Sequence, residues 1–296
     1  MKVLNYGSLN VDYVYSVDHI IVGGETQHSS KLEVFSGGKG LNQSIALAKA
    51  GVPVYHAGIV GTDGDILLEA CKEAGVNTKY IRRLPVKGGH TMIQVDKNAQ
   101  NCIILYGGTN QMQTKEFVDE VLADFGEGDY LILQNEINML DYIIDQAYEK
   151  KMKIVMNPSP FDDKLSTCDL SKVYLFLVNE IEGEQITGCK DKDQILDAMA
   201  ARFPNARFVL TLGSDGAVYY DGKEKVFQDI FKVKAVDTTA AGDTFIGYFI
   251  AAVIEGRSIQ EALRMAAKAS SIAVSRPGAT PSIPRADEVK KELGML

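Results

Sequence analysis

Residues 130–156, YLILQNEINMLDYIIDQAYEKKMKIVM, contain the pattern that decides the fold of this chain. The short apolar runs Tyr130–Leu133 and Lys153–Met156 flank a longer amphipathic segment, residues 140–150. Two runs of strand length with a helical segment between them are typical of a β-α-β unit, whose two strands are parallel and whose helix covers one face of the sheet. We therefore expect a parallel sheet in this part of the chain.

The same alternation continues in both directions from this unit. Strands are expected at residues 3–6, 54–60, 173–178 and 208–211, and helices at 42–50, 66–74 and 260–274, with another that begins around residue 245. This order predicts an α/β fold with three layers, in which helices cover both faces of a mostly parallel central sheet.

Residues 11–35 and 90–106 interrupt the alternation, because β-prone residues and turn formers follow one another there without an intervening helix. We expect these two segments to form a small β-sheet lid on a single domain that spans residues 1–296. A sheet with one face over an active site needs a cover for its other face, and a second copy of the chain would supply it. A homodimer through the lid is therefore expected.

Composition and charge exclude several classes of protein. The chain has 296 residues and a net charge of −8, so no basic stripe for a nucleic-acid backbone is expected. No apolar run is long enough to cross a bilayer or to resemble a signal peptide, which favours a cytoplasmic protein without a membrane partner. The cysteines lack the C-x-x-C spacing of zinc and redox sites, and they are Cys71, Cys102, Cys168 and Cys189.

Polar residues follow directly after several of the expected strands. In open α/β sheets, ligands bind beyond the carboxyl ends of the strands, so these side chains are the first candidates for a site. They are Asn10, Asp12, Glu136, Asn157, Asn179, Glu182 and, after the strand at 208–211, Gly213.

The segment Ser36–Asn42, SGGKGLN, is rich in glycine. Its glycines let the backbone approach a ligand, and Lys39 and Asn42 offer hydrogen-bond donors. The segment is neither a phosphate-binding Walker loop, since Gly40 follows Lys39, nor a dinucleotide fingerprint. Taken alone, it is either a glycine-rich turn that opens a helix or a substrate loop.

Residues 236–245, VDTTAAGDTF, lead into an apolar helix. Small residues at a helix start leave backbone N–H groups free to face an anion, and the helix dipole favours negative charge there. A phosphoryl group would fit. Asp243 is then either an ordinary acid in a first helical turn or a catalytic base beside a transferred phosphate.

The segments at 36–42 and 237–245 together resemble the two signatures of the ribokinase-like (PfkB) carbohydrate kinases, a family that includes the ribokinases. Four further segments occur in the family's order, at residues 7–12, 24–26, 179–182 and 211–216. The resemblance covers nearly the whole chain. It implies the family's α/β/α fold with a β-sheet lid.

The resemblance also implies roles for individual residues in sugar phosphorylation. Asp243 would take the proton from a primary hydroxyl, and the N–H groups of Ala241, Gly242 and Asp243 would form an anion hole for the γ-phosphate of ATP. The sugar hydroxyls would be held by Asn10, Asp12, Gly37, Gly38, Lys39, Asn42 and Glu136. This set favours D-ribose, phosphorylated to ribose 5-phosphate.

Nucleotide and cation sites are implied in the same way. ATP would contact Asn179, Thr211, Gly213, Gly216, Ala240 and Gly242. Asn179 and Glu182 would organise Mg²⁺ through water, and a capping box on a helix is an alternative for this pair. An activating K⁺ would be held by Asp237, Thr239, Ala273, Gly278 and Ser282, although a turn that ends a helix would also explain residues 276–278.

Three alternatives remain at this point. The family signatures are shared with kinases for other sugars and nucleosides, such as fructose and adenosine. A non-catalytic sugar-binding protein on the same fold is a second alternative, because a fold does not fix a function. A dinucleotide-dependent oxidoreductase would need a glycine fingerprint after the first strand, and Gly7–Asn10 lacks it.

Overall fold

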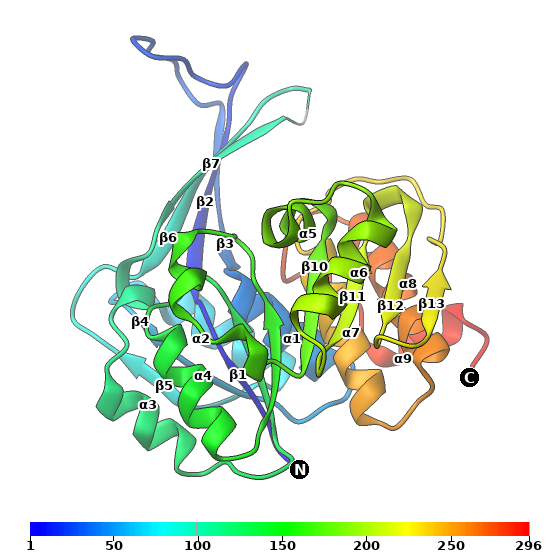
Figure 1. Ribbon diagram of the computed structural model, residues 1–296. Coiled ribbons are helices and arrows are strands. Elements are labelled where there is room, and N and C mark those ends of the chain that lie inside the picture. Colours follow the sequence, from blue (N-terminus) through cyan, green and yellow to red (C-terminus); the bar gives the residue numbers. More distant parts are fainter. Residues whose placement is uncertain (99, 296) are drawn as a thin grey trace.

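A computed structural model describes residues 1–98 and 100–295, and its centre is a nine-stranded sheet (Figure 1). In spatial order the strands are β13 (Lys225–Gln228), β12 (Ala217–Tyr220), β11 (Arg207–Thr211), β10 (Leu175–Asn179), β9 (Lys153–Asn157), β8 (Tyr130–Gln134), β1 (Val3–Tyr6), β4 (Tyr55–Val60) and β5 (Asn77–Arg83). All neighbours from β11 to β5 are parallel, and β12 and β13 add antiparallel pairs at one edge.

Helices cover both faces of this sheet and enclose two hydrophobic cores. One core is completed by α1 (Lys39–Lys49), α2 (Asp65–Ala74), α7 (Ala241–Ile254), α8 (Ile259–Val274) and α9 (Ala286–Glu292). The other is completed by α3 (Lys115–Leu122), α4 (Leu140–Glu149), α5 (Glu180–Thr187) and α6 (Lys192–Arg202). Strand β8 shows the period of two, since Tyr130 and Ile132 face the first core and Leu131 and Leu133 face the second. The predicted three-layer α/β/α fold is confirmed.

A second sheet has four strands and projects from the body (Figure 1). Its strands are β3 (Lys31–Gly37), β2 (Asn10–Ser16), β6 (Gly89–Val95) and β7 (Asn101–Tyr106), in that spatial order. Strand β2 is parallel to β6 and antiparallel to β3, and β6 is antiparallel to β7. This is the small lid sheet that the sequence predicts beside the main sheet.

Short 3-10 helices complete the chain, at η1 (Gly108–Gln111), η2 (Asp163–Thr167), η3 (Leu170–Lys172) and η4 (Gly213–Asp215). Helices α1 and α7 approach each other closely because Gly247 of α7 faces Ala46 of α1, where a Cβ atom would overlap. Their N-terminal parts also meet, because Asn42 and Gln43 of α1 hydrogen-bond to Asp243 of α7, and the candidate site forms there. Among residues 1–98 and 100–295, no helix has both the length and the apolar character needed to cross a membrane.

Candidate functional site

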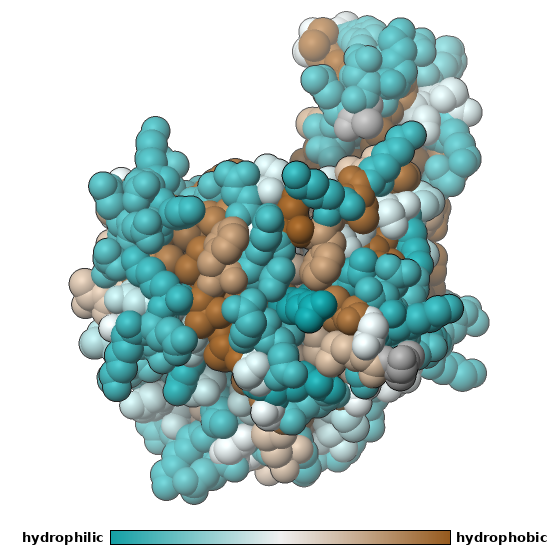
Figure 2. Space-filling view, turned by 90° about the vertical axis from the view of Figure 1, so that its right-hand side faces the viewer, coloured by the Kyte–Doolittle hydropathy of each residue, from teal (hydrophilic) through white to brown (hydrophobic). Residues whose placement is uncertain are grey.

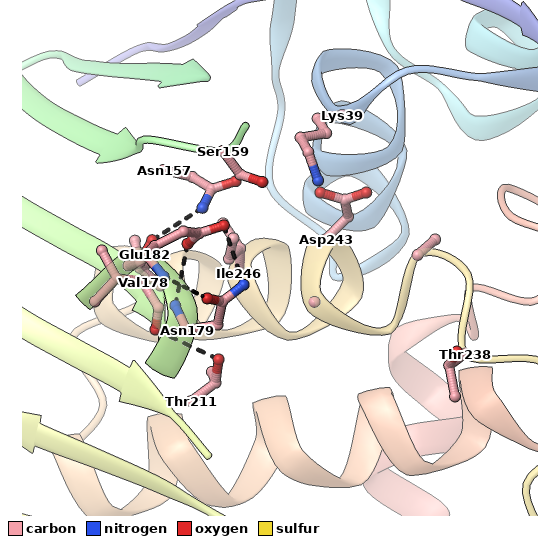
Figure 3. Close-up of a pocket in the computed structure, with 13 residues that line it drawn as sticks. Lys39, Asn157, Ser159, Val178, Asn179, Glu182, Thr211, Thr238, Asp243 and Ile246 are labelled. Carbon is pink, nitrogen blue, oxygen red and sulfur yellow. Dashed lines mark hydrogen bonds between the residues drawn. The ribbon is translucent and has the colours of Figure 1, made fainter. Parts of the chain in front are cut away.

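A cavity of about 200 Å³ lies at the carboxyl ends of β10 and β11 (Figure 3). Residues from the starts of α1, α5 and α7 also line it, so the cavity occupies the position that ligands prefer in an open α/β sheet. Its lining consists of Lys39, Asn157, Ser159, Leu177, Val178, Asn179, Glu182, Thr211, Thr238, Ala240, Gly242, Asp243 and Ile246.

Asp243, in the first turn of α7, is buried at the cavity wall. Two amides of helix α1 hold its carboxylate: Asn42 Nδ2 donates to Oδ2 and Gln43 Nε2 donates to Oδ1, each over 2.9 Å. An acid in a first helical turn is commonly exposed and interacts only with the helix dipole. Asp243 instead has a fixed orientation toward a cavity.

Lys39 is the first residue of α1, and its ammonium group points toward the Asp243 carboxylate (Figure 3). Burial alone would lower the pKa of Lys39, but the negative charges of Asp243, Glu136 and Glu182 outweigh it and raise the pKa. The lysine therefore carries a positive charge in a site that three carboxylates surround. That charge faces the cavity in which Asp243 lies.

Glu136 follows β8 and reaches the start of α1. Its Oε2 accepts hydrogen bonds from the backbone N–H of Lys39, over 3.1 Å, and from the hydroxyl of Ser8. Ser8 Oγ also accepts from the N–H of Gly40, over 3.2 Å, so two orphan donors of the helix start are satisfied. Burial raises the pKa of Glu136, although the charge of Lys39 opposes that change.

Asp12 of β2 lies against the glycine loop. A Cβ atom on Gly37 would overlap the Asp12 carboxylate, which explains why this position is glycine. Thr91 Oγ1 donates to Asp12 Oδ1 over 2.6 Å. Burial raises the pKa of Asp12 to about 6, against the Thr91 hydrogen bond and with the help of the Glu136 charge.

Asn10, at the start of β2, is buried and has a fixed amide orientation. Its Oδ1 accepts a hydrogen bond of 2.7 Å from Asn110 Nδ2, and Asn110 Oδ1 in turn accepts from the N–H of Leu9 over 3.0 Å. Gly38 has a φ of 94° and packs against the backbone of residues 8–10, a conformation that favours glycine. The sugar residues implied by the resemblance thus lie together around the start of α1.

The residues before α7 form its N-terminal cap. Ala240 has a φ of 58°, an uncommon conformation for alanine, and it lines the cavity together with Gly242 and Asp243. Gly242 and Asp243 are first-turn residues, whose N–H groups lack a carbonyl partner within the helix. The N–H of Ala241 donates to the Thr238 carbonyl over 3.2 Å, so this member of the expected anion hole has a protein partner.

Asn179 and Glu182 form a capping box at the start of α5. Asn179 Oδ1 accepts from the N–H of Glu182 over 2.9 Å, and the Glu182 carboxylate accepts from the N–H and side-chain amide of Asn179. Both residues also line the cavity, as does Thr211. Gly213 and Gly216 lie just beyond Thr211 but do not line the cavity.

The segment before α7 is joined to the loop after α8. Asp237 Oδ1 accepts from the N–H of Thr239 over 2.8 Å, and Oδ2 accepts from the N–H of Gly278 over 2.9 Å. Burial would raise the pKa of Asp237, but these hydrogen bonds outweigh it and lower the pKa. An ionised carboxylate therefore lies between the two loops. Ala273 lies at the end of α8, and Ser282 lies in the loop that follows it.

Sequence reasoning missed several polar residues that support the site, among them Ser8, Gln43, Thr91 and Asn110. Ser8 and Gln43 lie inside or directly beside the glycine-rich and strand-end motifs, so their position was a usable signal. Thr91 and Asn110 reach the site through the pairing of β2 with β6 and through the turn η1. No local sequence pattern predicts either arrangement.

Known proteins resemble this chain over nearly its whole length. Residues 1–286 match the model of the pfkB family carbohydrate kinases. The chain is 34% identical to the ribokinase of Haemophilus influenzae, over 95% of each chain. Among solved structures, the ribokinase of Thermotoga maritima aligns with a TM-score of 0.88 at 32% identity, covering 99% of each chain. The ribokinase of Arabidopsis thaliana complexed with ribose and ATP aligns with a TM-score of 0.86 at 29% identity, covering 99% of this chain and 98% of that one.

Proposed function

Because the chain belongs to the pfkB family of carbohydrate kinases and is a phosphotransferase with an alcohol acceptor, we propose that it transfers the γ-phosphoryl group of ATP to the primary hydroxyl of D-ribose. The products are ribose 5-phosphate and ADP. One observation carries the proposal: the Asp243 carboxylate is fixed at the start of α7, between the polar cluster around Lys39 and the cavity at the ends of β10 and β11.

The sugar binds on the side of Asp243 where the lid sheet begins. Asp12 and Glu136 supply acceptors for adjacent hydroxyls, and Asn10 has its Oδ1 occupied by Asn110, so its NH₂ group is free to donate. Asn42 Oδ1 is buried and has no hydrogen-bond partner within the described part of the chain, which suits acceptance from a sugar hydroxyl. A pocket of such groups rejects ligands that leave them unpaired.

Asp243 then acts as the general base that takes the proton of the attacking hydroxyl. The N–H groups of Gly242 and Asp243 face the γ-phosphoryl group, and Lys39 adds a positive charge beside it. Phosphoryl transfer needs little covalent chemistry from the protein, so catalysis rests on orientation and on stabilising charge. Fixed amides in a closed site do both without reorganising.

Residues Asn179 and Glu182 fit a role near a Mg²⁺–nucleotide complex. Both line the cavity, and Glu182 keeps its carboxylate oxygens bonded to Asn179, so the pair would hold Mg²⁺ through water rather than as direct ligands. When bound, Mg²⁺ neutralises charge on the nucleotide phosphates. No group of three or more His, Cys, Asp or Glu side chains suited to a metal occurs in residues 1–98 and 100–295.

The loops at Asp237 and Gly278 fit a monovalent cation. Each Asp237 oxygen accepts a single backbone hydrogen bond and retains a further lone pair. Thr239 would offer an oxygen from the same segment, and Ala273, Gly278 and Ser282 would offer oxygens from the end of α8 and the loop after it, where the Val274 carbonyl accepts from the N–H of Asp237. The Asp237 carboxylate is ionised and lies on the segment that leads into α7. A K⁺ ion held there would add positive charge beside the start of that helix.

Ribose is favoured over other acceptors by the relatives that carry the name ribokinase and by the Arabidopsis structure with ribose and ATP. An ADP-release assay with ribose, deoxyribose, fructose and adenosine tests this choice. We expect kcat/KM to be at least about 10-fold higher for ribose than for the others, since a hydroxyl-binding pocket discriminates by hydrogen bonds left unpaired. A clear preference for another acceptor would refute the choice of ribose and leave the chemistry intact.

The lid sheet also favours a homodimer. It projects from the body and carries apolar side chains on its surface (Figure 2), and every residue of its outer strand β7 is exposed. Leu32 and Val34 of β3 and Met92 of β6 are exposed as well. An apolar sheet of this kind is commonly covered by a partner. Sedimentation should show a dimer at micromolar concentration, and a monomer alone would contradict this assignment.

A further inference from the structure

A row of buried side-chain amides runs beneath helix α1 and ends on Asp243. Its members are Gln43, Gln134 and Asn5, which we call the amide chain, and all three are 0% exposed. Gln134 Nε2 donates to Gln43 Oε1 over 2.7 Å and to Asn5 Oδ1 over 2.9 Å. At the two ends, Gln43 Nε2 donates to Asp243 Oδ1 and Asn5 Nδ2 donates to the Gly40 carbonyl over 2.7 Å.

The direction of every hydrogen bond in the amide chain is fixed by its ends. An ionised carboxylate and a backbone carbonyl can only accept, so Gln43 and Asn5 must each turn an NH₂ group outward. Their oxygens then face Gln134, which must place its own NH₂ group between them. The amide chain has one arrangement with these bonds satisfied, and a flip of any member would set like groups against each other.

Packing does not explain this row. An amide buried without hydrogen bonds costs free energy, and apolar side chains of similar size would fill the space beneath α1 at lower cost. The row connects two structures that the site needs in register: the first turn of α1, through Gly40, and the first turn of α7, through Asp243. The function of the amide chain therefore concerns Asp243.

We propose that Gln43 is a positioning residue, which holds the Asp243 carboxylate so that a free lone pair faces the acceptor hydroxyl, and that Gln134 and Asn5 hold Gln43 in turn. This inference rests on the proposed role of Asp243 as the base. Asn42 fixes the other carboxylate oxygen from the same helix, so rotation of the carboxylate is blocked from both sides. A misplacement of about 1 Å at a reacting group can cost about 10²-fold in rate.

The substitution Gln43→Glu tests orientation and charge together. It keeps the shape and the bond from Gln134 but places a second carboxylate against Asp243 Oδ1, and two such groups share one proton. The charges of Lys39 and Glu136 act on Asp243, and Glu182 lines the same cavity; the substitution leaves all three groups in place. We expect the acidic limb of the kcat–pH profile to move upward by about one pH unit or more.

The substitution Gln43→Met removes the donor and keeps the volume. The expected result is a fall in kcat of about 10-fold to 10²-fold, with KM for sugar and ATP within about threefold of the parent. The matched control is Gln113→Met, because Gln113 is also a buried amide, but its Oε1 accepts from the Tyr6 hydroxyl and its backbone N–H donates to Asn138 instead of contacting the site. Thermal unfolding of both variants reports any general loss of stability.

Asp243→Asn is measured in parallel to separate the two claims. An inactive Asp243→Asn variant together with a normal kcat and an unmoved pH profile in both Gln43 variants would overturn the role of Gln43 and leave the base assignment standing. An active Asp243→Asn variant would overturn the base assignment itself. A fall in kcat that Gln113→Met reproduces equally would also count against Gln43, because it would reflect the loss of any buried amide.

Discussion

Asp243→Asn is the substitution whose consequences the structure defines most closely. The two side chains have the same shape, so the change removes the negative charge and the ability to take a proton without opening a cavity. Both oxygens of Asp243 accept amide hydrogen bonds of 2.9 Å, from Asn42 and Gln43. An asparagine must turn its NH₂ group toward one of these donors, so one hydrogen bond is lost and a donor–donor contact replaces it.

The expected effect on catalysis is a fall in kcat of at least about 10²-fold, which corresponds to about 2.7 kcal/mol of activation free energy. Stability should fall by about 1–3 kcal/mol, because the displaced donor is buried without a partner. Lys39 also loses one of the three carboxylates that raise its pKa. KM for ATP should change much less than kcat, since the proposed nucleotide contacts include Asn179 and Thr211 at the ends of β10 and β11, which the substitution leaves in place.

The assay is coupled ADP release at saturating ribose and ATP, with urea unfolding of the same preparations. The matched control is Asp287→Asn, the same chemical change in the first turn of α9, where Asp287 is exposed. Asp287→Asn should keep both kcat and stability. Turnover of a correctly folded Asp243→Asn variant within about threefold of the parent would refute the reasoning.

Three further predictions concern neighbouring residues. Burial raises the pKa of Asp12 from 3.8 to about 6, so its ionised form lowers the free energy of unfolding by up to about 3 kcal/mol above pH 6. Asp12→Asn should therefore raise the free energy of unfolding, measured in urea, at pH 7.5, and this gain should be gone near pH 4. An equal gain at both pH values would contradict this prediction. Gly37→Ala should raise KM for the sugar by about 10-fold, because the added methyl displaces Asp12. The control Gly126→Ala should leave KM unchanged, because no atom lies within 4 Å of the added methyl. Equal KM values in the two variants would count against the role of the glycine loop. Replacing K⁺ by tetramethylammonium should lower kcat, because a bulky cation does not fit between the Asp237 and Gly278 loops, and equal rates would argue against a cation site there.

Much of the architecture could be predicted from periodicity alone. Residues 130–156 alternate between the two cores in the strands and carry one apolar stripe in the helix, and the structure places β8, α4 and β9 there. The lid segments could be recognised because a helix was missing between β-prone runs. The pairing of β2 with β6, which brings Thr91 to Asp12, joins residues 79 positions apart and leaves no local trace.

Some residues of the site could likewise be predicted from the sequence and others could not. Lys39, Asn42 and Asp243 stand in glycine-rich motifs at helix starts, where free N–H groups and charge indicate an anion site from the sequence alone. Gln43 directly follows the glycine-rich segment and Gln134 ends a strand, but neither position indicates burial. Only the fold shows that both are fully buried and bonded to each other, with Gln43 also bonded to Asp243. Long-range burial of polar groups is the information that sequence patterns lack.

The central claim is that the start of α7 presents a base and free amides to a nucleotide phosphate, with the primary hydroxyl of a sugar opposite. Phosphorus NMR of the reaction with ¹³C-labelled ribose, ATP, Mg²⁺ and K⁺ tests it directly, because coupling identifies the carbon that receives the phosphate. We expect ADP and a single sugar phosphate, with phosphorus joined through oxygen to C5. Phosphate on any other carbon, or ADP formed without a sugar phosphate, would contradict the account.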